Sequence, residues 1–289
     1  MLCYLDGSDA ALDGVLRPGN AGSNTGRDQT RAVGLSLEQL PASCMAEEIL
    51  VRGDSASACV HELVDFCREG NLRFSVGFDI TAEVRDAITK VGDDAWAPAI
   101  TQDGEPTADD ETRPREAYVC ELTEMLDLSA WGPGARLICR RERAHPGAQL
   151  SLIDTDGWRH QCFLTDQAGE DIAELDRIHR AHAHVEQRIE DGKKLGLSKL
   201  PFRDFQMNEA WMQLALCAQD LLGFAKELTL TGELAKAKPK TLRYRLLHQA
   251  GRLARSGRRT KLRLARDWPW AQDLLAACRR LDTLPLQAG

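Results

Sequence analysis

The sequence predicts an α/β fold with a β-rich middle part and a basic C-terminal segment. Three observations support this class. Strand-like and helix-like segments alternate up to residue 91, short strand-like segments dominate from Gly92 to Thr165, and helical periodicity returns from about Glu170. With 289 residues, of which 43% are hydrophobic, the chain can bury a large core. We therefore divide it into segments 1–91, 92–165, 166–230 and 231–289.

The first segment has the strand–helix rhythm of an α/β domain. Short strands are expected around the turn at residues 6–9, and the turn-rich residues 17–25 lead into a helix that ends near Leu40. Alternation and helical spacing then predict a strand, a helix, a strand and a helix at Ile49–Val51, Ser57–Glu69, Arg73–Phe78 and Thr81–Val91.

The rest of the chain changes from strands to helices. Short strands are expected at Ala117–Leu122, Arg136–Arg141 and Trp158–Leu164, separated by acidic loops rich in Gly and Pro, and this pattern looks like a β-rich insertion. Beyond it, one long helix is expected over about Glu170–Glu190, an apolar helix over Asn208–Ala225, and a last helix over Trp270–Leu281.

Composition excludes several classes of protein. No run approaches the roughly 18 to 20 apolar residues that a membrane span needs, and the N-terminus has no secretory signal pattern. The nine cysteines form no C-x-x-C pair, which argues against a zinc ribbon and a thioredoxin-like site. Scattered cysteines in odd number fit a reducing cytosol, so we expect a soluble cytoplasmic protein.

The net charge of −7 conceals a strongly basic block. Between Lys236 and Arg266 the chain carries twelve Lys and Arg residues and neither Asp nor Glu. Such a block is either a solvated face or an arm that binds polyanions. The DNA-contacting candidates within it are Arg243, Arg245, Arg252, Arg255, Arg258, Arg259, Lys261 and Arg263.

Two carboxylates are candidates for metal-dependent chemistry. Asp54 follows the expected strand Ile49–Val51, and α/β folds place ligand chemistry at such strand ends. Glu186 lies on a helix, where His179, His182 and Lys193 share its face at helical spacing. Carboxylates that converge from a strand end and a helix suit Mg²⁺, which prefers one or two carboxylates with water and phosphate oxygens.

Each of these features also has a structural interpretation. A strand-terminal Asp is more often a cap or turn residue, and Glu on an amphipathic helix is by default a solvated charge. Arg52-Gly53-Asp54 also spells a cell-adhesion tripeptide, but nothing indicates export. His182 and His184 diverge on a helix, which argues against zinc.

Taken in order, four stretches resemble the DDE transposases of bacterial insertion sequences, in the group of insertion sequence thirteen-eighty. Leu12–Thr25 resembles the family's second-strand region, and Val51-Arg52-Gly53-Asp54-Ser55 resembles the motif of its second catalytic Asp. Residues 179–186, with Lys193, resemble the region of its catalytic Glu, where the family pattern is Tyr-x2-Arg-x3-Glu-x6-Lys. The Arg- and Lys-rich tail closing on Trp268-Pro269-Trp270 resembles the family's C-terminal end.

The resemblance implies a ribonuclease-H-like core whose β-rich insertion is Gly92–Thr165. Asp54 and Glu186 would be catalytic and would hold Mg²⁺ or Mn²⁺ in a two-metal site. Lys193, His179 and His182 would contact DNA, although the two histidines replace the Tyr and Arg of the family pattern. The family's first catalytic Asp would lie on a strand before Leu2, so we expect an N-terminally truncated chain that is inactive alone.

The expected function is cleavage and strand transfer at transposon ends, within DNA transposition and recombination. Its partners would be double-stranded DNA, carrying the terminal inverted repeats and the target, and further copies of the chain on that DNA. The alternatives are a non-catalytic DNA-binding remnant, an unrelated Mg²⁺-dependent nuclease or phosphoesterase, and a decayed product without function.

Overall fold

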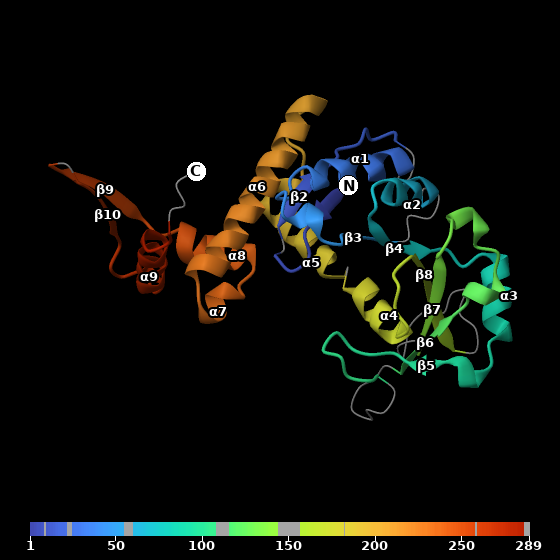
Figure 1. The fold of residues 1–289 in the computed structure, drawn as a ribbon. Coiled ribbons are helices and arrows are strands. Elements are labelled where there is room, and N and C mark those ends of the chain that lie inside the picture. Colours follow the sequence, from blue (N-terminus) through green and yellow to red (C-terminus); the bar gives the residue numbers. More distant parts are fainter. Residues whose placement is uncertain are drawn as a thin grey trace. The chain divides into compact units, whose positions relative to one another are not determined.

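The structure, a computed structural model, describes residues 1–8, 10–21, 25–54, 60–107, 116–143, 157–181, 183–257 and 259–285. The chain forms two compact units (Figure 1). Unit 1 comprises Met1 and Arg17–Glu186, and unit 2 comprises Leu2–Leu16 and Gln187–Gly289. This division differs from the four segments expected from the sequence, because it joins the first strands to the C-terminal part.

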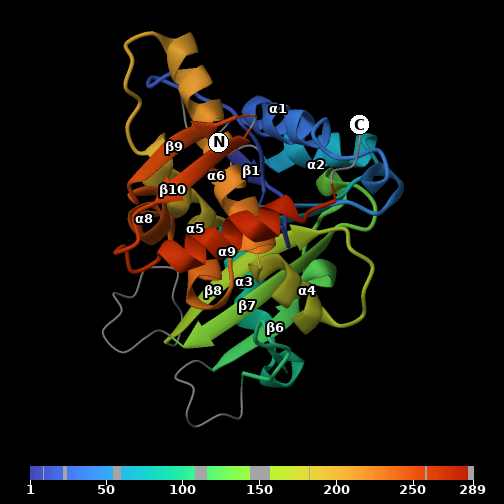
Figure 2. The same cartoon turned by 90° about the vertical axis from the view of Figure 1, so that its left-hand side faces the viewer.

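Unit 1 contains a six-stranded mixed sheet in the order β3-β4-β8-β7-β6-β5. The pair β3–β4 is parallel, and the other neighbouring strands are antiparallel. Figure 2 shows β6, β7 and β8 side by side. The strands are β3 (Leu50–Gly53), β4 (Arg73–Phe78), β5 (Ala97–Pro98), β6 (Ala117–Glu121), β7 (Arg136–Arg143) and β8 (Trp158–Thr165).

The β-rich segment Gly92–Thr165 continues the sheet that holds β3 and β4. Its last strand, β8, pairs with β4 from Ser75↔Thr165 to Phe78↔Cys162. The strands expected to form an insertion therefore share one sheet with the strand that precedes Asp54. Sequence alternation could not reveal this pairing, because it joins residues about 90 positions apart.

Helices cover both faces of this sheet. On one face α2 (Val60–Glu69) and α3 (Ala82–Lys90) bury their apolar sides against strand residues such as Phe74 and Leu137, and α1 (Gly26–Leu37) packs on α2. On the other face α4 (Ile172–Arg180) covers Ile138 and Phe163. Side chains that alternate along β7 thus serve two cores. Single-turn 3₁₀ helices in this unit lie at Cys44–Ala46, Asp93–Ala95, Thr123–Met125 and Ser129–Trp131.

Three cysteines form a row across the sheet beneath α2 and α3. Cys139 on β7 lies directly opposite Cys120 on β6 and Cys162 on β8. All three are buried and carry free thiols. Contacts with the two neighbouring thiols, together with burial, raise the pKa of Cys139 well above its usual value. In this row the cysteines pack as small apolar residues.

The single helix expected over Glu170–Glu190 is wrong. The structure has α4 and a second helix, α5 (Ala183–Gly192). Tertiary hydrogen bonds hold the last turn of α4: Arg52 Nη1 donates to the Ile178 carbonyl at 2.5 Å, and Gln102 Nε2 donates to the Arg177 carbonyl at 3.1 Å.

Unit 2 is built around α6 (Phe205–Thr229), which is longer than the helix expected at Asn208–Ala225. The hairpin β1 (Leu2–Tyr4) and β2 (Ala11–Gly14) packs on it, with Ala11, Met212 and Leu216 in one cluster. The Ala11 N–H also donates to Asp220 Oδ1 at 2.7 Å. The helical stretch α5 continues as the π-helix η6 (Lys193–Leu197).

The basic segment folds into short helices and a hairpin. Leu230, Leu234, Leu242 and Leu246 form a small core with Ala277. The elements are α7 (Gly232–Ala235), α8 (Pro239–Leu242), the π-helix η7 (Arg243–Leu247), β9 (Gly251–Ser256), β10 (Arg259–Leu264) and α9 (Ala271–Asp282). The sequence did not predict the hairpin β9–β10. Among the described helices of the chain, none is long and apolar enough to cross a membrane.

Candidate functional site

Asp54 lies at the carboxyl end of β3, as the sequence predicted. It directly follows Gly53, the last residue of that strand, and its side chain is exposed. Because β3 and β4 are parallel, their carboxyl ends meet at the same edge of the sheet. This edge is where an open α/β sheet offers strand-terminal side chains to a ligand.

A second carboxylate follows the neighbouring strand at the same edge. Asp79 comes directly after Phe78, the last residue of β4, and is exposed. Sequence reasoning did not single it out, although the alternating strand Arg73–Phe78 before it was the available signal. Asp79 is therefore the natural comparison for any role that is assigned to Asp54.

The end of α4 is fastened to the same two strands. Arg52, two residues before Asp54, binds the Ile178 carbonyl of α4. Ser75 on β4 lies 2.9 Å, measured from its Oγ, from Nδ1 of His179. These bonds fix the C-terminal turn of α4, and the chain then enters the helix that carries Glu186.

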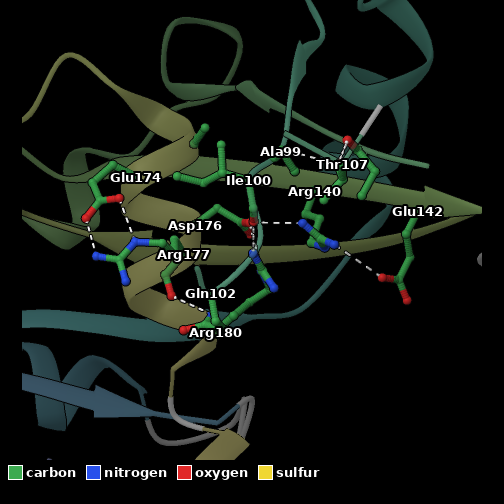
Figure 3. Close-up of polar contacts among 12 residues, drawn as sticks. Ala99, Ile100, Gln102, Thr107, Arg140, Glu142, Glu174, Asp176, Arg177 and Arg180 are labelled. Atoms are coloured by element: carbon green, nitrogen blue, oxygen red, sulfur yellow. Dashed lines mark hydrogen bonds and ion pairs between the residues drawn. The ribbon is translucent and has the colours of Figure 1, made fainter. Parts of the chain in front are cut away.

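A buried ion network holds α4 to the sheet (Figure 3). Asp176, whose side chain is 1% exposed, accepts from Arg140 Nη1 on β7 at 2.9 Å and from Arg180 Nε at 2.8 Å. Arg180 also donates to the Ile100 carbonyl, and Arg140 reaches Glu142 at 3.5 Å. Partners from β7 and from α4 itself thus meet at the Asp176 carboxylate, and Arg180 extends the network to Ile100 before β6, which fixes the position of α4.

Glu186 lies in the first turn of α5 and is exposed. Lys193, exposed as well, is the first residue of η6, which continues that helix. His182 lies outside the described residues, so its predicted DNA contact stays a prediction. In the part of the chain that the structure describes, Asp54 and Glu186 share no hydrogen bond or common cation.

His179 is buried rather than open to a ligand. Its ring is 8% exposed and stacks on Phe163, with ring centroids 4.3 Å apart and an interplanar angle of 5°. With Ser75 on its Nδ1 side, the ring joins α4 to β4 and β8. This environment favours a packing role for His179, and a contact with DNA would require it to become exposed.

The basic candidates occupy two environments. Arg243 and Arg245 lie in η7, where the Arg245 guanidinium stacks over Trp270 at 5.1 Å and is 3.9 Å from Glu233. Arg252, Arg255, Arg259, Lys261 and Arg263 lie on the exposed hairpin β9–β10. Arg258 lies outside the described residues. The hairpin therefore carries most of the described basic candidates.

The candidate side chains can be compared with the ligands that a divalent cation requires. Among the described residues, no three His, Cys, Asp or Glu side chains gather into a metal-binding group. Asp54 and Glu186 are both exposed carboxylates, and Mg²⁺ sites commonly combine one or two carboxylates with water and phosphate oxygens. Their chemistry therefore suits a site that a phosphate-bearing substrate would complete.

Unit 1 thus carries carboxylates at a strand edge, and unit 2 carries an arginine-rich hairpin. A family model described as transposase DDE domain group 1 matches residues 1–286. The chain therefore belongs to the transposase DDE domain family. No match was found among curated proteins.

Proposed function

We propose that this chain is the transposase of a bacterial insertion sequence, built on a ribonuclease-H-like core and acting on transposon ends. The observation that carries this proposal is the family match over residues 1–286. The parallel pair β3–β4, with Asp54 at its carboxyl edge, supports it. The reaction would be hydrolysis and then strand transfer, in which water and later a 3′-hydroxyl attacks a phosphodiester.

Asp54 and Glu186 are proposed as the catalytic carboxylates that hold Mg²⁺ or Mn²⁺. Two such ions, when bound, supply electrostatic stabilisation to the attacking and leaving oxygens of the phosphodiester. Asp54 would offer its carboxylate from a fixed strand end, because Arg52 ties β3 to the Ile178 carbonyl. Lys193, Arg243, Arg245 and the hairpin cations Arg252, Arg259, Lys261 and Arg263 would neutralise phosphates of double-stranded DNA, including terminal repeats and target.

A second candidate function is DNA binding without catalysis. The exposed basic hairpin β9–β10 favours it, because the hairpin could bind DNA whether or not Asp54 and Glu186 hold a metal. Replacement of Asp54 distinguishes the two, because it would alter metal binding in a transposase and nothing in a purely DNA-binding protein.

Metal binding by the chain as it stands is the first test. Mn²⁺ titration followed by electron paramagnetic resonance should show binding that Asp54→Ala or Glu186→Ala weakens at least tenfold. Asp79→Ala, at the end of the neighbouring strand, and Glu190→Gln, one turn along α5, are the controls and should bind Mn²⁺ as the parent does. Equal loss in Asp54→Ala and Asp79→Ala would contradict the proposed site.

DNA cleavage is the second test. A labelled duplex carrying the transposon end should be bound by the protein and cleaved in the presence of Mg²⁺, and Asp54→Ala should abolish the cleavage but not the binding. Cleavage that persists in Asp54→Ala would overturn the proposed catalytic role of Asp54. Binding without cleavage by the parent protein would favour the second candidate function.

Assembly of several copies on DNA is also proposed, through an exposed apolar seam on α6. The seam follows heptad spacing over three heptads. It consists of Met207, Leu214, Cys217, Leu221, Phe224 and Leu228. Leu221 is 70% exposed. Leu221→Glu should reduce the sedimenting mass of the chain, whereas Leu200→Glu, at an exposed leucine outside the seam, should not. A monomer at all concentrations would exclude this assembly in the absence of DNA.

A further inference from the structure

The hairpin β9–β10 is a two-stranded ribbon with both faces in solvent. It pairs six residues of each strand, from Gly251↔Leu264 to Ser256↔Arg259. All described residues of the two strands are exposed except Ala254 and Leu264, which are half-buried. Figure 1 shows the ribbon extending beyond α8 and α9 of the same unit. A segment that buries so little of itself is available to a ligand.

Pairing sorts the side chains of the ribbon onto two different faces. Cross-strand partners share a face, and successive residues alternate between faces. One face, which we call the basic face, carries Arg252, Ala254, Ser256, Arg259, Lys261 and Arg263. The opposite face, the leucine face, carries Gly251, Leu253, Arg255, Thr260, Leu262 and Leu264.

Two measurements confirm the composition of the leucine face. A Cβ built on Gly251 would lie 3.2 Å from Leu262 Cδ1 and 3.7 Å from Leu264 Cδ2, so these three positions lie together. Leu253 and Leu262 face each other across the strands and are 70% and 55% exposed. Arg255 is therefore separated from the other cations of the ribbon, although it is equally basic and exposed.

The basic face is electrostatically uncompensated within the described structure. Arg252 lies directly opposite Arg263, and like charges in that position destabilise a strand pair. No described carboxylate lies within 4.0 Å of a basic-face cation. Since residues 236–266 contain neither Asp nor Glu, the ribbon has no internal counter-charge. A polyanion on this face would relieve the repulsion.

The base of the ribbon is fixed to its own unit. The Ala265 N–H donates to the Ala250 carbonyl at 3.1 Å, one step beyond the paired strands. The Trp268 indole N–H donates to the Arg245 carbonyl at 2.7 Å. This bond joins the segment that precedes the ribbon to the segment that follows it. Trp268, Trp270 and Tyr244 pack edge to face around this point. The basic face is thus presented from an anchored base.

From these observations we infer that the basic face of the β9–β10 ribbon lies in a groove of duplex DNA, while the leucine face and Arg255 point away from it. This inference rests on the proposed function and adds how the DNA is held. The ribbon is about 20 Å long with strands about 4.8 Å apart. A major groove about 12 Å wide admits a two-stranded ribbon.

The closing experiment compares one arginine from each face. Full-length protein with Arg252→Gln or Arg263→Gln is titrated with a fluorescent duplex at several salt concentrations. Arg255→Gln removes the same charge from the other face of the same strand and is the matched control. Each basic-face variant should reduce the slope of log affinity against log salt by about 0.9, and the combined Arg252, Arg259, Lys261 and Arg263 variant by about 3.6. Arg255→Gln should leave the slope unchanged.

Three results would overturn the inference, and each differs from failure of the proposed function. Equal loss of slope in Arg255→Gln and Arg252→Gln would show that the ribbon acts only as a diffuse charge. Loss of duplex affinity in Leu253→Thr, with no loss in Arg252→Gln, would assign DNA to the leucine face. Ribbon variants that lose binding to anionic phosphatidylserine vesicles but not to DNA would assign the ribbon to a lipid surface. Absence of duplex binding by the parent protein would instead refute the proposed function.

Discussion

Asp176→Asn is the most informative single change in the sheet domain, because it removes one charge and almost no volume. Asp176 is 1% exposed and accepts from two guanidinium groups, Arg140 at 2.9 Å and Arg180 at 2.8 Å. The Arg180 side chain is 25% exposed and can recover solvation. Arg140 is 8% exposed, and its remaining carboxylate, Glu142, lies at 3.5 Å. The variant therefore leaves one guanidinium buried without an adequate counter-charge.

Breaking a buried pair by removing one partner costs about 3 to 5 kcal/mol. Glu142 partly compensates the charge of Arg140, and the amide of Asn has the same shape as the carboxylate. We therefore expect Asp176→Asn to lower the free energy of unfolding by about 3 kcal/mol, the lower end of this range. A loss of that size lowers the melting temperature of a domain of 150 to 250 residues by about 6 to 12 °C. Urea and thermal unfolding, followed by circular dichroism, measure both quantities.

Two further variants test the reasoning behind this number. Arg177→Gln removes the ion pair between Arg177 and Glu174 on the same helix. The side chains of Arg177 and Glu174 are 31% and 40% exposed. Such a surface pair contributes at most about 1 kcal/mol. Joint replacement of Arg140 and Asp176 by Met and Leu should recover much of the loss, because no buried charge remains. If Asp176→Asn destabilises no more than Arg177→Gln, the network does not hold α4.

Two other predictions follow from the pKa shifts. Burial raises the pKa of Cys67 to about 12, and the pKa of Cys139 rises well above its usual value, so neither thiol should react with an aromatic disulfide reagent near pH 8. Exposed Cys217 should react at once in the monomeric chain. Rapid modification of the buried pair would show that the sheet opens readily. Hydrogen bonds from Arg136 hold the pKa of Glu121 below its usual value. Since the folded-state pKa is depressed, this stabilisation is present above about pH 4.3 and is lost as the pH falls below it. Glu121→Gln should therefore be less stable than the parent by about 1 kcal/mol at neutral pH, and this difference should narrow as the pH falls below about 4.3, as measured by urea unfolding. A difference that does not change with pH would contradict the assignment.

The local sequence pattern was sufficient to predict the short strands and helices of unit 1. The strand Arg73–Phe78 was predicted with its observed bounds because one residue in two faces each core. The break between α4 and α5 was not predicted from helical periodicity, and the contact that holds the end of α4 comes from Arg52, which lies 126 residues before its partner Ile178. The hairpin was missed for another reason. Arg and Leu alternate on both sides of Gly257, whose φ is +59°. This alternation was overlooked because the segment was interpreted as a block of charge.

The candidate site shows the same limit. A carboxylate after a strand could be placed at a sheet edge from sequence, and Asp54 lies there. The interpretation of His179 as a DNA contact rested on the family resemblance and on helical spacing. Neither distinguishes a face that meets solvent from one that meets Ser75 and Phe163. Asp176 was not singled out at all. Its i,i+4 spacing to Arg180 was visible, but Arg140 comes from a strand 36 residues earlier.

In the folded protein the row of cysteines across β6, β7 and β8 is inaccessible to reagents in solution. Cys120, Cys139 and Cys162 are buried with residues of α2 and α3, so an oxidant or alkylating reagent can reach them only when those helices move off the sheet or the unit unfolds. Their labelling rate then measures how often this core opens, without any introduced probe. A chain that is released in an oxidising setting before its sheet has closed would be exposed to cross-linking at the positions that the native core keeps unreactive.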